Sequence, residues 1–163
     1  MVDNQIILFK FIQTNNINWS DISYNYKLSE NFIREFQDKV DWHEISAYQT
    51  LSENFIIEFK DKVNWYHISA FQNLSENFIR EFRDKVDWDF ISINQKLSES
   101  FIIEFQDKIY WGCISSCQKL SENFIRKFKY KLNWKYLLEY QELSESFIRE
   151  FKDKVNWYSI SCN

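Results

Sequence analysis

The stretch LSENFIREFQDKVDWHEISAYQT, residues 28–50, decides the fold, because further copies of it follow one another every 23 residues to the end of the chain. These copies begin at Leu51, Leu74, Leu97, Leu120 and Leu143. One tryptophan recurs at the same interval in this chain: Trp19, Trp42, Trp65, Trp88, Trp111, Trp134 and Trp157. A strict period of this length predicts a stacked array of repeats.

Each copy has the pattern of two short helices. Ser29 and Asp41 are typical N-cap residues, and each precedes a stretch with helical spacing of apolar residues. This spacing predicts two buried faces, the first formed by Phe32, Ile33, Phe36 and Val40 and the second by Trp42, Ile45 and Tyr48. Helices of about ten residues are marginal alone, so stacking must hold them.

We therefore predict an all-α protein, an α-solenoid of about seven 23-residue helix-turn-helix repeats with one continuous stacked core. Residues 1–27 hold a degenerate N-terminal capping repeat, and residues 28–163 hold six tandem repeats, the last one truncated; together they form a single solenoid domain. A leucine-rich repeat is the rival architecture, but no copy shows its L-x-L-x-x-N strand.

Composition narrows the function classes. An aromatic content of 20% argues against disorder, and a net charge of −4 provides no basic field to attract nucleic acid or an anionic membrane. No apolar stretch is long enough for a membrane span, and no signal peptide is recognisable. The 3 cysteines fit free thiols in a reducing, intracellular compartment.

No catalytic constellation, phosphate loop or cofactor motif stands out, so we expect no enzyme activity and no cofactor. Cys113 and Cys117 have the i,i+4 spacing that two metal ligands could use, but no further ligands lie in register, and we expect no metal site. Helical repeats can read single-stranded RNA, but no basic row follows a phosphate backbone here, so nucleic-acid binding is the less favoured alternative.

Three positions of the second helix differ most between copies, and we predict that they form a partner-binding stripe. The first is His43, Tyr66, Asp89, Gly112, Lys135 and Tyr158; the second is Glu44, His67, Phe90, Cys113 and Tyr136; the third is Ala47, Ala70, Ile93, Ser116 and Glu139. Drift at exposed positions is the competing explanation. Drift does not readily explain why Glu30, Asp38 and Lys39, which are also exposed in the predicted first helix, hardly change between copies.

Other recurring residues have structural interpretations. Ser46 and its equivalents are predicted to let helices approach closely, and Gln49 and its equivalents to form an amide ladder along the stack. Charges on the first helix are spaced for pairing within that helix, as for Glu30 and Arg34. Ile57 and Ile103 stand where other copies have arginine and are expected to be isolated surface residues, with a second apolar patch as the alternative.

The unit LSENFIREFQDKVDW, followed by a variable pair and Ile-Ser, resembles a tandem-repeat family of giant DNA viruses that infect amoebae, the mimivirus and megavirus group. The resemblance covers residues 28–163 well and residues 1–27 weakly. It implies a repeat protein that engages host or viral proteins, located in the host cytoplasm, and it supplies no catalytic motif.

Two functions remain open from sequence. The first is a non-catalytic scaffold for protein–protein interaction, which recognises an unidentified host or viral protein through the variable stripe. The alternative is a structural protein that self-assembles, as a homodimer or end to end, through Trp157 and Ile160 of the truncated last repeat.

Overall fold

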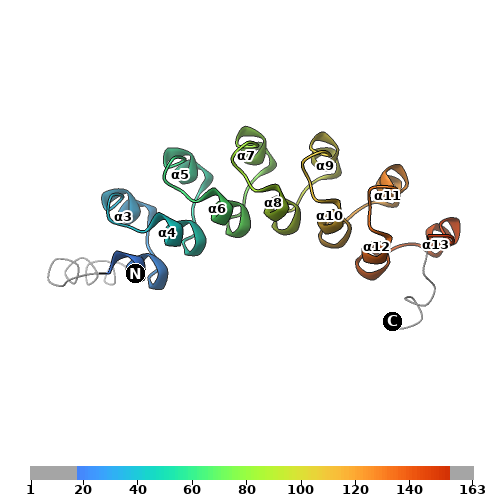
Figure 1. Cartoon of the computed structure of the whole chain (residues 1–163), viewed down its shortest axis with the longest axis horizontal. Helices are drawn as coiled ribbons and strands as arrows, with labels where there is room; N and C mark the ends of the chain where they lie inside the picture. Colours follow the sequence, from blue (N-terminus) through green and yellow to red (C-terminus); the bar gives the residue numbers. More distant parts are fainter. Residues whose placement is uncertain (1–17, 155–163) are drawn as a thin grey trace. The chain divides into compact units, whose positions relative to one another are not determined.

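Short helices follow one another along the chain in the computed structural model, which describes residues 18–154. Within this range there are twelve helices and no strand (Figure 1). Two compact units divide the chain, Met1–Gln72 and Asn73–Asn163. The first contains α2 (Trp19–Asn25), α3 (Glu30–Glu35), α4 (Trp42–Tyr48), α5 (Glu53–Glu58) and α6 (Trp65–Phe71). The second contains α7 (Glu76–Glu81), α8 (Trp88–Asn94), α9 (Glu99–Glu104), α10 (Trp111–Cys117), α11 (Glu122–Phe128), α12 (Trp134–Tyr140) and α13 (Glu145–Glu150).

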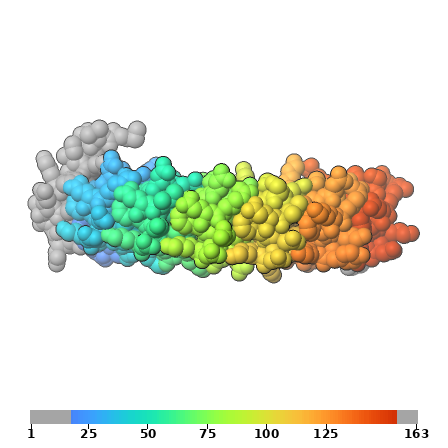
Figure 2. All heavy atoms as spheres, turned by 90° about the horizontal axis from the view of Figure 1, so that it is seen from above, coloured from blue at the N-terminus to red at the C-terminus, as the bar shows by residue number. Residues whose placement is uncertain are grey.

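Each repeat contributes a first helix, which follows the Leu-Ser pair, and a second helix, which begins at the tryptophan. In each unit the first helices lie in one row and the second helices in another (Figure 1). Figure 2 looks onto the first helices and shows the repeats of each unit as successive bands of colour. Within each unit, neighbouring second helices contact each other, as α2 does with α4 and α8 with α10. The predicted all-helical repeat architecture is confirmed.

Both kinds of helix begin at the predicted caps. The Ser29 hydroxyl accepts a hydrogen bond from the Phe32 N–H, and the Asp41 carboxylate accepts from the N–H groups of His43 and Glu44. The same pattern recurs in the other described repeats, except at α10, where Tyr110 is the N-cap and no side chain caps the helix. A short polar N-cap residue satisfies N–H groups that have no partner within the helix.

The helices are shorter than the ten residues expected. Helix α3 ends at Glu35, and Phe36 leaves the helical region with φ −107° and ψ 25°. The N–H groups of Lys39 and Val40 then both donate to the Phe36 carbonyl, at 2.8 and 3.0 Å, which closes a tight turn. Val40 nevertheless reaches the core, as predicted.

The core lies between the two rows of helices and is built mainly from isoleucine and phenylalanine. Ile33 and Ile45 are fully buried, and so are their equivalents in the following repeats, except Ile148, which is half-buried. The prediction for Tyr48 is wrong, because its side chain is 58% exposed. The buried side of α4 runs through Trp42, Ile45 and Ser46, which have i, i+3, i+4 spacing, and this turns Tyr48 toward solvent.

The tryptophans connect the two helices of a repeat and reach the next repeat. The Trp42 indole N–H donates to the Gln37 carbonyl at 2.9 Å, which anchors the ring to the end of the preceding turn. The same ring lies 4.9 Å from Phe59 and 6.2 Å from Phe55, between ring centroids, and both belong to the following repeat. Trp88, Trp111 and Trp134 make equivalent contacts in the second unit. One side chain per copy therefore contributes to two interfaces.

The recurring serine joins consecutive repeats through the backbone. Ser46 is fully buried, and its hydroxyl donates to the Trp42 carbonyl at 2.6 Å. It also accepts from the Asn64 N–H, at 2.9 Å, at the start of the next second helix. Ser115 bonds in the same way to Trp111 and Asn133. Small size was predicted for this position; the two hydrogen bonds of the hydroxyl were not.

The recurring glutamine is also buried and forms three bonds, two to the preceding repeat and one to the first residue of its own repeat. The Gln72 carboxamide oxygen accepts from the Leu51 N–H at 3.0 Å, and its NH₂ group donates to the carbonyls of Ser46 and Gln49. Gln118 bonds in the same way to Leu97, Ser92 and Gln95. These bonds correct the predicted amide ladder, since each side chain bonds to backbone groups and not to the next amide.

Candidate functional site

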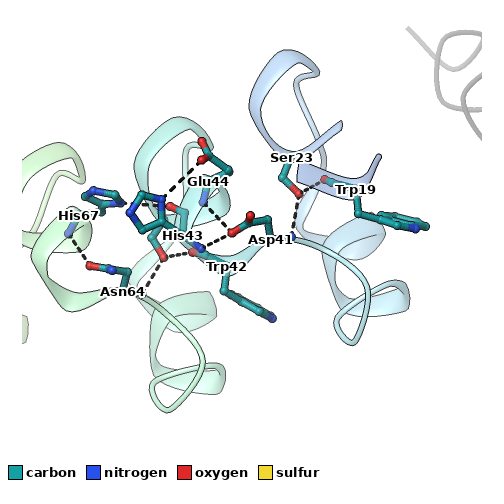
Figure 3. A network of polar contacts seen from close by, with 9 residues as sticks. Trp19, Ser23, Asp41, Trp42, His43, Glu44, Asn64 and His67 are labelled. Atoms are coloured by element: carbon teal, nitrogen blue, oxygen red, sulfur yellow. Dashed lines mark hydrogen bonds and ion pairs between the residues drawn. The ribbon is translucent and has the colours of Figure 1, made fainter. Parts of the chain in front are cut away.

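The second helices carry the predicted stripe, and the polar network in Figure 3 positions its first members. Asp41 and Asn64 cap α4 and α6, which fixes where His43 and His67 leave the backbone. The His67 ring nitrogen Nδ1 lies 3.1 Å from the His43 carbonyl oxygen, and the two rings meet edge to face with centroids 4.2 Å apart (Figure 3). His43 Nδ1 also lies 3.5 Å from a Glu44 carboxylate oxygen.

Burial at the three variable positions is uneven. At the first position, four of the five described side chains are exposed and Gly112 is half-buried: His43, Tyr66, Asp89, Gly112 and Lys135. At the second, Glu44, His67, Phe90 and Cys113 are half-buried and Tyr136 is exposed. At the third, Ile93 and Glu139 are exposed, Ala47 and Ser116 are half-buried, and Ala70 is only 8% exposed. Ala70 is therefore buried beneath the face and offers little surface for contact with a partner.

The last residue of each second helix is a fourth exposed, variable position, which the sequence analysis did not predict. Its members are Asn25, Tyr48, Phe71, Asn94, Cys117 and Tyr140. Phe71 is 63% exposed and Tyr140 is 56% exposed. The change from tyrosine to asparagine or cysteine between copies was an available signal, because a packed core position rarely accepts residues so different in volume and polarity.

Large apolar side chains gather on these helices. Seven exposed large apolar or aromatic side chains lie on second helices: Tyr24, Tyr48, Tyr66, Phe71, Ile93, Tyr136 and Tyr140. Among the described first helices, Ile57 is the corresponding exposed residue, and Ile103 is half-buried. The exposed apolar surface is thus concentrated on one of the two rows of helices in each unit.

The fixed charges of the first helices have structural roles that link consecutive repeats. Glu30 accepts from the Ser52 N–H at 2.7 Å, and Asp38 forms an ion pair with Lys62 at 3.0 Å. The Lys39 ammonium lies over the Trp19 ring, 5.7 Å from its centroid. Their constancy therefore does not by itself argue against drift at the variable positions.

The expected pairing on the first helix is only part of the network. Arg34 lies 3.6 Å from Glu30 on its own helix, but it makes a shorter contact of 2.8 Å with Glu58 in the next repeat. It also covers the Phe55 ring at 5.0 Å. Arg80 and Arg126 repeat this arrangement with Glu104 and Glu150.

Cys113 and Cys117 lie on α10, and Cys117, with Ser116 and Tyr140, helps to line a hollow of about 320 Å³. Burial, together with the nearby Cys117 and Asp89, raises the pKa of the Cys113 thiol, which disfavours the thiolate. Across residues 18–154, no group of three or more histidine, cysteine or acidic side chains is placed to hold a metal ion.

Three predicted site residues, Tyr158, Trp157 and Ile160, lie outside the described residues. Within residues 18–154, no helix is both long and apolar enough to cross a bilayer. The geometry defines a helical-repeat protein of the α-solenoid class. No family model, curated protein or solved structure matches the chain.

Proposed function

We infer that this protein is a non-catalytic scaffold that binds another protein through the exposed face of its second helices. The observation that carries this proposal is the concentration of exposed aromatic and apolar side chains there, compared with the charged first helices. Tyrosine and phenylalanine provide large contact areas with few rotatable bonds, which suits them to binding hot spots. The expected resemblance to repeat proteins of amoeba-infecting viruses supports a partner in an infected amoeba.

Different positions of the repeat hold the framework together and form the exposed face, and this separation supports the same proposal. Recurring inter-repeat contacts use Ser46, Gln72, Arg34 and their equivalents, so this part of the framework does not depend on the variable positions. Side chains on the second-helix face can therefore differ between copies at little cost to folding, because surface substitutions away from such contacts usually change stability by less than about 0.5 kcal/mol.

A quantitative pull-down from amoebal lysate tests the proposal with two matched variants. The binding variant replaces Tyr48, Phe71 and Tyr140 on second helices with alanine. The control replaces Ile57 and Tyr130, which are exposed outside the second helices, with alanine. We expect a captured protein to be lost from the binding variant and kept by the control, with unchanged circular dichroism for both. Identical captures from wild type and binding variant would contradict the proposal.

A further inference from the structure

A tyrosine replaces the acid of a recurring ion pair in the copy that begins at Leu120. Elsewhere an aspartate in the turn after the first helix pairs with a lysine of the next copy, as Asp38 does with Lys62 at 3.0 Å. An equivalent pair in the second unit lies 3.2 Å apart. In the copy from Leu120 this position is Tyr130, and the corresponding Lys154 lies over the tyrosine ring, 5.6 Å from its centroid. The Lys154 ammonium therefore meets an aromatic ring where Lys62 meets a carboxylate.

A second exchange in the same copy reverses a charge close to Tyr130. Lys127, three residues before Tyr130, stands at the position of Glu58. In the first unit Glu58 forms an ion pair with Arg34 at 2.8 Å. The Lys127 ammonium instead lies over the ring of its neighbour Phe128, 5.3 Å from the centroid. A negative charge that other copies use between repeats is thus replaced by a positive one.

Two further lysines lie beside Tyr130. The Lys129 ammonium lies 5.2 Å from the Tyr130 ring centroid and 5.7 Å from that of Phe151. Lys131 donates to the Gln106 carboxamide oxygen at 3.0 Å. We call Tyr130 and its four lysines the lysine surface: Lys127, Lys129, Lys131 and Lys154. Among residues 18–154, no carboxylate forms an ion pair with any of these four ammonium groups.

The lysine surface is accessible and locally basic. Tyr130 is 81% exposed, and three of the four lysines are exposed, while Lys129 is half-buried. Residues 121–131 contain four basic side chains and one acidic one, whereas the equivalent residues 98–108 contain one basic and three acidic. The arginine of this segment, Arg126, pairs with two glutamates. The lysines therefore provide the excess positive charge, which attracts an anionic group.

The positive charge is confined to about one repeat, which limits the anion that fits. Asp107 and Asp153 hold the position of Tyr130 in the preceding and following copies, and both are exposed. A nucleic-acid strand or an anionic bilayer that extends over neighbouring copies would also meet these carboxylates, and like charges repel. A short anionic segment avoids that repulsion.

A short acidic peptide fits the dimensions of the surface. The Lys129 and Lys154 ammonium groups lie 5.2 and 5.6 Å from the Tyr130 centroid, so they are no more than about 11 Å apart. Three residues of an extended chain span at most about 11 Å, so two carboxylates in one short segment can reach both groups. A lysine ammonium is a compact charge with three donors, and the tyrosine hydroxyl can donate a further hydrogen bond.

We propose that the lysine surface binds a short segment of a partner protein that is rich in aspartate and glutamate. Carboxylates of the segment pair with the lysines, and Tyr130 contributes its ring and its hydroxyl. The segment thereby supplies to Lys154 the negative charge that Asp38 supplies to Lys62. This docking surface is separate from the exposed face of the second helices and does not rest on it.

Fluorescence anisotropy with the full chain tests the proposal. The probe is a labelled peptide of six glutamates between glycine–serine flanks. We expect saturable binding that weakens at least about tenfold, or about 1.4 kcal/mol, when Lys127→Glu is combined with Tyr130→Asp. Both substitutions install residues that other copies have at the same positions, so the circular dichroism spectrum should not change.

A control variant separates the local surface from the net charge. Asn25→Asp with Lys27→Glu changes the net charge by the same amount at exposed positions of the first unit and should bind the peptide as wild type does. The proposal is overturned if the peptide shows no saturable binding, if the Lys127 and Tyr130 variant binds as wild type does, or if both variants lose affinity equally. Tighter binding of oligothymidylate or of phosphatidylserine vesicles than of the peptide would also overturn it.

This proposal and the proposed scaffold function fail separately. The second-helix variant of the pull-down leaves the lysine surface intact, whereas its control carries Tyr130→Ala. A protein bound at the lysine surface would be lost from that control and kept by the second-helix variant. This is the reverse of the result expected for the second-helix face.

Discussion

At the scale of single residues, the buried glutamine stands out because one side chain forms three hydrogen bonds to backbone groups. Gln118 bonds to the Leu97 N–H and to the carbonyls of Ser92 and Gln95. Gln118→Ala leaves these buried groups without partners, so we expect a loss of roughly 3 kcal/mol in the free energy of unfolding, measured in urea. Gln106→Ala removes only an exposed bond from Lys131 and should cost less than about 1 kcal/mol. Equal losses would contradict this role.

A titration tests the contact between a first-helix glutamate and the next repeat. Hydrogen bonds from the Ser144 side chain and N–H, and then the nearby Arg126, lower the pKa of Glu122. A lowered folded-state pKa means that the stabilisation is present above the unfolded-state value and is lost as pH falls through the folded-state value. Carbon NMR should find the Glu122 carboxyl titrating below the ordinary glutamate range. In Ser144→Ala, which keeps only the N–H, the pKa should rise partway back.

The sequence identified the recurring residues, but it did not show for all of them whether the side chain faces the core or the solvent. Ile45 was placed in the core correctly because its spacing from the tryptophan left no alternative. Tyr48 was misplaced because periodicity treats any aromatic side chain as core, whereas the small Ser46 occupies that buried arc. The three bonds of each glutamine could not be predicted either, since they depend on one N–H group and two carbonyls more than twenty residues away.

At the scale of elements, α10 is the exception that reveals what the caps contribute. Its N-cap is Tyr110, without a side-chain bond, whereas α12 has Asn133, which accepts from the N–H groups of Lys135 and Tyr136. Tyr110→Asn should supply the missing acceptor and raise the free energy of unfolding by about 1 kcal/mol, measured by urea denaturation. Asn133→Ala should lower it by a similar amount. A destabilising Tyr110→Asn would show that the exposed tyrosine ring has a packing role.

The existence and order of the helices followed from the sequence, and their lengths did not. The run from Phe32 to Val40 keeps helical spacing, yet α3 ends at Glu35 because the turn at Phe36 redirects the chain toward the next cap. Periodicity cannot separate a continuous helix from a short helix followed by a tight turn, because both place Val40 in the core.

At the scale of the whole molecule, no repeat is expected to fold alone. Helices of six and seven residues are far below the length at which isolated helices are stable in water. A peptide of residues 97–119 should therefore show a disordered circular dichroism spectrum, although the same residues are helical within the chain. The chain itself should show a helical spectrum that is lost cooperatively on heating. A helical peptide would mean that local propensity, and not stacking, holds the repeat.

The serine and glutamine bonds join the backbone of one repeat to that of the next with the same side chains at successive described interfaces. A copy that is duplicated or deleted within such a series meets a neighbour with the same donors and acceptors, so the new junction has no mismatch to repair. Genes encoding this repeat can thus lengthen or shorten by unequal recombination while the protein still folds. Each event would change the order of the surface residues, and new combinations would arise faster than by point mutation alone.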